Sequence, residues 1–138
     1  MKYMLIMNTP RDGYTQYMSW PKKILEANIA FMHAFNRKLK EAGELVGAEG
    51  LAAPTEARLV RAGKDGKPIT DGVFPESKEF LAGYWIVDVE SAERAYQLAA
   101  EASTAPGAPV KAADGTPIEH LWIEVRQIMS GPPKEVLG

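Results

Sequence analysis

The 138-residue chain predicts a single α+β domain of the ferredoxin-like type, a split βαβ unit with an inserted β-hairpin. The main observation is the order of its patterns: strand, helix, strand, hairpin, strand, helix, strand. The length suits one domain with a core of its own. The absence of cysteine excludes a disulfide scaffold, a thiolate metal site and a cysteine nucleophile. We assign residues 1–130 to the domain and expect residues 131–138 to form a loosely ordered tail.

The first half of the predicted unit is a strand followed by a long helix. Residues 3–7 are an apolar run without polar alternation, which is typical of a strand buried on both faces. Residues 8–19 are rich in turn formers. We expect Ser19 to cap the start of the helix and Gly43 to cap its end. One apolar face recurs at helical spacing: Ile24, Asn28, Phe31, Met32, Phe35, Leu39 and Ala42.

A second strand and a hairpin follow this helix. Residues 45–51 read as a strand that contains two glycines. Residues 57–62 and 67–70 flank the sequence Gly-Lys-Asp-Gly at 63–66, which is a strong hairpin signal. Asp71 and Gly72 provide another turn signal directly after the hairpin.

The second half repeats the strand, helix, strand order. Residues 80–89 form the most strand-like segment of the chain, rich in aromatic and branched side chains. We expect Ser91 to cap the second helix. Residues 104–117 contain three prolines and two glycines, which indicates a loop, and residues 118–129 alternate as a final strand.

The central strands are apolar on both sides, which predicts a homodimer. In the strand at 80–89, Tyr84 and Ile86 point one way, and Trp85 and Val87 point the other. A sheet of this type has helices on one face only, so its other face would be a large exposed apolar patch. Packing two such faces together in a symmetric dimer is the simplest way to cover it.

Composition narrows the classes of partner. The net charge of −2 argues against a nucleic-acid binder. The apolar run near the N-terminus is too short for a signal peptide, and no segment approaches about 20 apolar residues, so we expect no membrane association and a cytoplasmic protein. Two scattered histidines make a zinc site improbable, and no phosphate loop, dinucleotide fingerprint or nucleophile elbow occurs. We therefore expect no metal and no cofactor.

Four segments resemble one known family. Residues 71–79, DGVFPESKE, are similar to the motif Asp-Gly-Pro-Phe-Ala-Glu-Thr-Lys-Glu, which names the DGPF group of YCII-related proteins. Further similarity lies at residues 43–51, 81–87 and 123–127, and only residues 104–117 fall outside the resemblance. Two departures, Val73 for the motif's proline and Pro75 for its alanine, change the expected backbone of this loop.

The resemblance implies a dimeric α+β barrel, in agreement with the patterning. It implies little about chemistry. Some members are encoded beside extracytoplasmic-function sigma factors. A few relatives in the wider superfamily degrade aromatic compounds, and a histidine–aspartate pair has been proposed as their active site.

Three charged residues are candidates for catalysis. Asp71 could act as a general base, although it could equally form an Asx-turn with its own backbone. Lys78 could bind an acidic substrate or lower the pKa of Asp71, whereas such residues more often belong to solvated salt-bridge networks. Glu49 lies between the small residues Ala48 and Gly50, which would let a ligand approach; its alternative is an ordinary edge-strand carboxylate.

Four further residues are candidates for ligand contact. Trp85 and Tyr84 could wall a pocket, although aromatic residues of a central strand more often belong to the core. Ser77 keeps the hydroxyl of the motif's threonine. His120 shares a predicted strand face with Trp122 and could reach the pocket. The other histidine, His33, falls opposite the apolar face of its helix and should point to solvent.

The favoured hypothesis is a cofactor-independent small-molecule enzyme that uses acid–base chemistry in a pocket, with Asp71 as base and Glu49 or Lys78 assisting. The alternative is a non-catalytic binding or regulatory module linked to sigma-factor signalling, which rests on the resemblance. A third hypothesis, a purely structural dimer, predicts an interior filled with side chains and no cavity.

Overall fold

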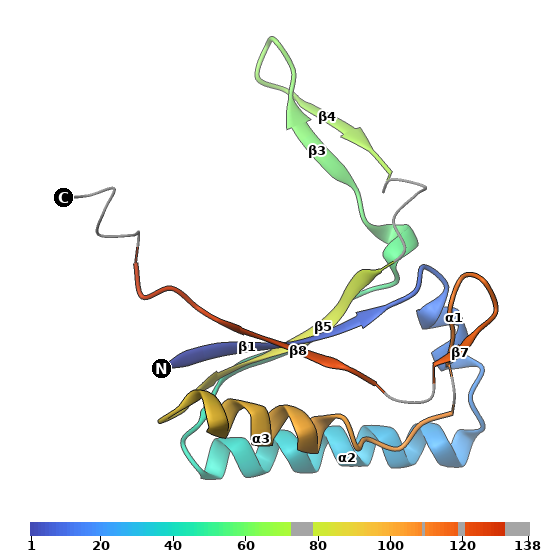
Figure 1. Cartoon of the computed structure of the whole chain (residues 1–138). Coiled ribbons are helices and arrows are strands. Elements are labelled where there is room, and N and C mark those ends of the chain that lie inside the picture. Colours follow the sequence, from blue (N-terminus) through green and yellow to red (C-terminus); the bar gives the residue numbers. More distant parts are fainter. Residues whose placement is uncertain (73–78, 109, 119–120, 132–138) are drawn as a thin grey trace.

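The computed structural model describes residues 1–72, 79–108, 110–118 and 121–131 (Figure 1). The chain forms a four-stranded sheet with helices on one face, and a long hairpin projects from it. The elements are, in order, β1 (Lys2–Thr9), α1 (Gly13–Met18), α2 (Lys22–Glu41), β2 (Leu45–Gly50), the 3-10 helix η1 (Pro54–Glu56), β3 (Leu59–Ala62), β4 (Pro68–Asp71), β5 (Phe80–Asp88), α3 (Ala92–Ala102), β6 (Val110–Lys111), β7 (Pro117–Ile118) and β8 (Ile123–Gln127).

The main sheet has the strand order β2-β5-β1-β8, and the neighbouring strands are antiparallel. At its centre, Leu5 of β1 pairs with Trp85 of β5 on one side and with Val125 of β8 on the other. This order is that of a ferredoxin-like split βαβ unit, so the predicted α+β fold is confirmed. The sheet formed by the described strands is open, and it does not close into a barrel within one chain.

The core lies between the sheet and helices α2 and α3. Alternation along the strands turns Leu5 and Trp85 toward the helices, where both are buried. Leu39 of α2 and Leu98 of α3 are fully buried against them. Phe35 of α2 meets the Trp85 ring edge-on, with 5.4 Å between ring centroids. Each such side chain contributes roughly 1.5–3 kcal/mol through its burial.

The opposite face of the sheet carries a second set of apolar side chains. Met4 and Ile6 of β1 pair with Ile86 and Tyr84 of β5, and all four are half-buried. Helices α2 and α3 both lie on the other side of the sheet (Figure 1). The apolar face that the alternation of β5 predicts is therefore not covered by either of these helices.

The start of the long helix differs from the prediction. Helix α2 begins at Lys22 after Pro21, whose side chain makes no capping hydrogen bond. Ser19 instead follows α1, a short helix in the segment expected to be turns, and its Oγ donates to the carbonyl of Gln16 at 2.6 Å. The prediction that Ser19 caps the long helix was wrong, because its hydroxyl is already engaged at the end of the preceding helix.

The other predicted helix ends are confirmed. Gly43 has a φ of +71° after α2, which favours glycine. The N–H of Gly43 donates to the carbonyl of Lys40 at 3.0 Å and that of Glu44 donates to Leu39 at 2.9 Å, as in a Schellman motif. At the start of α3, Ser91 Oγ accepts a hydrogen bond from the N–H of Arg94 at 3.1 Å.

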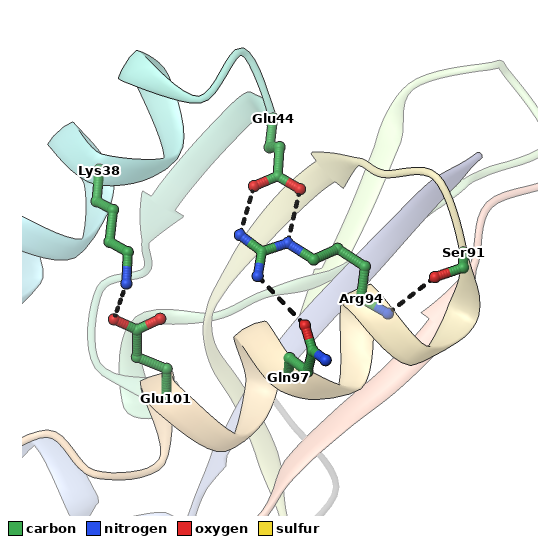
Figure 2. Close-up of polar contacts among 6 residues, drawn as sticks. All are labelled: Lys38, Glu44, Ser91, Arg94, Gln97 and Glu101. Atoms are coloured by element: carbon green, nitrogen blue, oxygen red, sulfur yellow. Dashed lines mark hydrogen bonds and ion pairs between the residues drawn. The ribbon is translucent and has the colours of Figure 1, made fainter.

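Polar contacts join α3 to the end of α2 and the residue before β2 (Figure 2). Arg94 Nε and Nη2 donate to the two carboxylate oxygens of Glu44 at 2.9 and 2.8 Å. Both side chains are mostly shielded, with 31% of Arg94 and 16% of Glu44 exposed. The hydrogen bonds from Arg94 hold the pKa of Glu44 below its ordinary value, against the opposing effect of burial. A more exposed pair, Lys38 and Glu101 at 2.8 Å, links α2 to α3.

Two hairpins flank the main sheet. The predicted hairpin is present as β3 and β4, every residue of these strands is exposed, and it projects away from the helices (Figure 1). The segment at 104–117 was expected to be loop throughout, but β6 pairs with β7 to form a second hairpin. Gln16 of α1 holds it by two hydrogen bonds with the backbone of Lys111, at 2.7 and 3.0 Å. The last strand, β8, is shorter than predicted, and the expected loose tail falls mostly on residues 132–138, outside the described part.

Candidate functional site

A cavity of about 630 Å³ opens at one end of the domain. Helices α1 and α2, strands β1, β2 and β5, and the segment that follows α3 all contribute to its walls. Its size falls within the range of small-molecule sites in proteins. We take this cavity as the candidate site.

One wall is the middle of α2. Asn28, Met32 and Asn36 recur at intervals of four residues and all line the cavity. Asn28 is 8% exposed, and both ends of its amide are engaged. Its Nδ2 donates to the carbonyl of Pro106 at 2.8 Å, and its Oδ1 accepts from the hydroxyl of Tyr17 at 3.3 Å. This amide therefore fastens α1 and the segment after α3 to the long helix.

The opposite wall is the sheet. Met7, Ala48 and Trp85 line it from β1, β2 and β5. Trp85 Nε1 donates to Asn36 Oδ1 at 2.7 Å, which connects the sheet wall to the helix wall. Because Trp85 also packs against Phe35, its ring is fixed both by a hydrogen bond and by the core.

The end wall is aromatic. Tyr14, Tyr17 and Trp20 line the cavity from α1 and the turn after it, and the Tyr17 and Trp20 ring centroids lie 5.0 Å apart. The segment after α3 packs on this wall at Gly107. A Cβ atom at Gly107 would lie 2.6 Å from Cη2 of Trp20, so the close approach requires glycine.

The charged groups at the cavity are few. Among the described residues that line it, Glu49 is the one carboxylate and His33 is the one histidine, and none is lysine or arginine. Both Glu49 and His33 are exposed, so they lie where the cavity meets solvent. Glu49 is the register partner of Tyr84, so its side chain lies on the same face of the sheet as Tyr84, opposite to the face of Ala48 and Trp85. Because β2 is an edge strand, Glu49 borders the cavity at the edge of the sheet.

The cavity brings together three of the predicted site residues: Glu49, Tyr84 and Trp85. Asp71 is not among the described residues that line it. It ends β4 on the projecting hairpin, where its Oδ1 accepts a hydrogen bond from the N–H of Gly72 at 2.8 Å. Ser77, Lys78 and His120 lie outside the described residues.

Sequence reasoning missed the two amides and the position of one histidine at the cavity. Asn28 was counted in the apolar face of the helix, and Asn36 was not considered. A buried amide at helical spacing within an apolar face is the signal that could have found the first, since buried polar groups require partners. His33 is exposed as expected, yet it lines the cavity mouth. The sequence could not place it there because the neighbouring wall comes from distant segments.

Other kinds of site are not seen in the described residues. They contain no group of three or more histidine, aspartate or glutamate side chains arranged to hold a metal ion. None of the helices within the described ranges is long and apolar enough to span a membrane.

Comparison with known proteins agrees with the fold. A model of the YCII-related domain matches residues 1–114, which run from β1 to the segment between β6 and β7. An uncharacterised protein of Rhizobium meliloti (strain 1021) is 32% identical over 87 residues, which cover 63% of this chain and 70% of the relative. The chain therefore belongs to the YCII-related family.

Proposed function

We propose that the protein binds a small, uncharged, largely apolar molecule in the cavity and, without a cofactor, catalyses proton transfer on it. The cavity carries this proposal, because its aromatic and aliphatic walls surround a small number of polar groups. Such a mixture is typical of ligand sites. It also distinguishes the proposal from a purely structural dimer, for which we expected an interior filled with side chains.

The groups at the cavity mouth suit acid–base chemistry. Carboxylate and imidazole side chains are common general acids and bases, and Glu49 and His33 both line the cavity. In this proposal Glu49 takes a proton from the bound molecule. His33 exchanges a proton with the bound molecule or with solvent. The role predicted for Asp71 as base, and for Lys78 as its assistant, stays a prediction.

We further propose that two chains pair through the uncovered face of the sheet. Met4, Ile6, Tyr84 and Ile86 form the middle of that face, and helices cover only the opposite one. Pairing would bury these side chains and complete a barrel between two subunits. Ile6→Glu should convert the protein to a monomer in analytical ultracentrifugation, whereas Val60→Glu on the exposed hairpin should not. Monomeric wild-type protein at micromolar concentration would refute the pairing.

A regulatory module linked to sigma-factor signalling remains the alternative prediction. It rests on the family resemblance, and no contact among the described residues favours it. A screen for ligands of the cavity separates it from the proposal.

The ligand proposal is tested by a thermal-shift screen of neutral aromatic and aliphatic fragments, with aromatic acids and divalent metals included. Ala52 is exposed and lines the cavity, so Ala52→Trp should block it. Ala30 is exposed on α2 and is not among the lining residues, so Ala30→Trp is the matched control. We expect neutral fragments to raise the melting temperature of wild type and Ala30→Trp but not of Ala52→Trp. Equal shifts in all three proteins would place binding elsewhere.

The catalytic part of the proposal needs a separate readout. For a bound fragment with an acidic C–H bond, hydrogen–deuterium exchange at that carbon can be followed by NMR in D₂O. Glu49→Gln should slow the catalysed exchange by at least about 100-fold, since general base catalysis typically contributes that much. Binding without any catalysed exchange in wild type would reduce the proposal to a binding protein.

A further inference from the structure

The hydrogen bond between Trp85 and Asn36 fixes the direction of an amide at the cavity. The indole N–H only donates, so the Asn36 atom that receives it at 2.7 Å is the carbonyl oxygen. This chemistry sets the orientation of the amide independently of any choice between its oxygen and nitrogen. The Asn36 NH₂ group must therefore point away from the indole N–H.

The Asn36 NH₂ group has no partner among the described residues. No hydrogen bond from Asn36 Nδ2 occurs there, whereas Asn28, about two turns earlier on the same wall, is engaged at both ends. No buried side-chain nitrogen or oxygen within the described ranges lacks a partner, so Nδ2 is accessible to solvent. Asn36 lines the cavity and is half-buried, which makes the cavity the route of access to its two N–H groups.

The charges around this amide indicate what it binds. A group that accepts hydrogen bonds from an amide can be a carboxylate or a neutral carbonyl oxygen. The described lining offers no lysine or arginine to balance a carboxylate, and its one carboxylate, Glu49, would repel an anion. A neutral carbonyl oxygen therefore fits best. The aromatic wall of Tyr17 and Trp20 suits an aromatic or similarly flat apolar body beside it.

We infer that Asn36 selects ligands that carry a neutral carbonyl group, such as ketones, esters or amides, by donating a hydrogen bond to the carbonyl oxygen. Trp85 is the positioning residue that holds the amide in the donating orientation. This inference rests on the proposed function, since it specifies the class of molecule that the same cavity takes. It makes Asn36 the residue that determines specificity, whereas Glu49 and His33 do the proton transfer.

The test compares two probes of nearly equal size and shape, acetophenone and ethylbenzene, with benzoate as the anionic counterpart. Dissociation constants are measured by NMR titration of ¹⁵N-labelled wild-type protein. We expect acetophenone to bind about fivefold more tightly than ethylbenzene, as one net hydrogen bond allows. We expect benzoate to bind more weakly than acetophenone. Benzoate binding as tightly as acetophenone would overturn the neutral-carbonyl assignment.

Two variants distinguish the role of Asn36 from that of Trp85, which holds its amide. Asn36→Asp keeps an oxygen for Trp85 but removes both donors, so it should bind ethylbenzene as wild type does and lose the preference for acetophenone. Trp85→Phe keeps an aromatic ring but frees the amide to turn, so the preference should shrink although Asn36 is present. A preference that persists in Asn36→Asp would overturn the inference.

The side-chain NH₂ signal of Asn36 can be followed in the wild-type protein, so this measurement does not depend on whether the variants fold. In the wild-type spectrum it should shift with acetophenone and stay in place with ethylbenzene. If both probes bind with equal affinity and neither moves this signal, the inference fails while the cavity remains a ligand site. If no probe binds, the proposed function fails and this inference fails with it.

Discussion

The sheet and helices around the cavity differ from the β3–β4 hairpin in what holds their side chains in place. Around the cavity, Trp85 is fixed by the ring of Phe35 and by a hydrogen bond to Asn36, and the hydrogen bond joins residues that are 49 positions apart in the chain. On the hairpin every strand residue is exposed, and within the described residues Asp71 Oδ1 accepts a hydrogen bond only from the N–H of the next residue. A preorganised site requires side chains that are held by such packing and hydrogen bonds.

This contrast bears on how a functional residue is recognised. The family motif begins at Asp71 on the hairpin, and for that reason Asp71 and Lys78 were named as candidates for catalysis. The cavity instead lies between amides and aromatic side chains whose importance is visible only when α2 and β5 are in place. Motif similarity identified the family, whereas geometry identified the candidate site.

The largest expected difference between the two regions is in stability. Leu98 is fully buried under the sheet, so Leu98→Ala should lower the free energy of unfolding by about 3 kcal/mol through lost burial and a new void. Val60 on the hairpin is 62% exposed, and Val60→Ala should change it by less than about 0.5 kcal/mol. Urea unfolding monitored by circular dichroism measures both. Equal losses would mean that the hairpin is packed against something as firmly as the core.

A smaller effect is expected at the aromatic wall. Gly107→Ala would force a methyl group against the Trp20 ring and should cost roughly 1–2 kcal/mol in unfolding free energy. It should also weaken fragment binding, because the Trp20 ring must move. Gly72 follows β4, and a Cβ atom there would meet no described residue within 4 Å, so Gly72→Ala is the matched control and should leave binding unchanged. Unaltered fragment binding in Gly107→Ala would mean that the position of the Trp20 ring does not affect ligand binding.

The Glu44–Arg94 pair predicts a pH dependence of the helix–sheet core. Because the pKa of Glu44 is lowered in the folded state, the pair stabilises the protein fully above the ordinary carboxyl range, near about 4.3, and less as pH falls through the lowered value. Glu44→Gln should therefore cost about 1 kcal/mol at pH 7, and the difference from wild type should shrink toward pH 3. Melting curves of the two proteins across this range test it. A difference that grows on acidification would contradict the assigned direction.

The smallest effect is expected at Asp71. Asp71→Asn keeps an oxygen for the N–H of Gly72, and Asp71 does not line the cavity, so unfolding free energy should change by less than about 0.5 kcal/mol and fragment affinity by less than twofold. A tenfold loss of fragment affinity would mean that Asp71 takes part in ligand binding, as the sequence-based hypothesis proposed.

Much of the fold was predictable because local patterns encode it. The strand positions, the cap at Ser91, the cap at Gly43 and the hairpin turn each depend on residues a few positions apart. The strand pairing β6–β7 was missed because Gln16, 95 residues away from Lys111, helps to hold it. The same distance effect misled the assignment of Ser19, which ends α1, a short helix that packs beside β6.

The site was predictable only in part. Glu49 was found because small neighbours leave room beside it, and Trp85 because large aromatic residues stand out in a strand. Asn36 carries no local signal, since an asparagine on a helix is ordinary until its partner across the core is known. His33 was placed correctly toward solvent, but only the folded chain shows that it also lines the cavity.

The central claim is that ligand binding belongs to the cavity and not to the hairpin. Mapping the backbone and side-chain NMR shifts caused by acetophenone in the wild-type protein tests it most directly. The account predicts shifts at Ala48, at the Trp85 indole N–H and at the Asn36 amide, with the signals of β3, β4 and Gly72 unchanged. Shifts concentrated at Asp71 and Gly72, with the cavity signals unmoved, would contradict it.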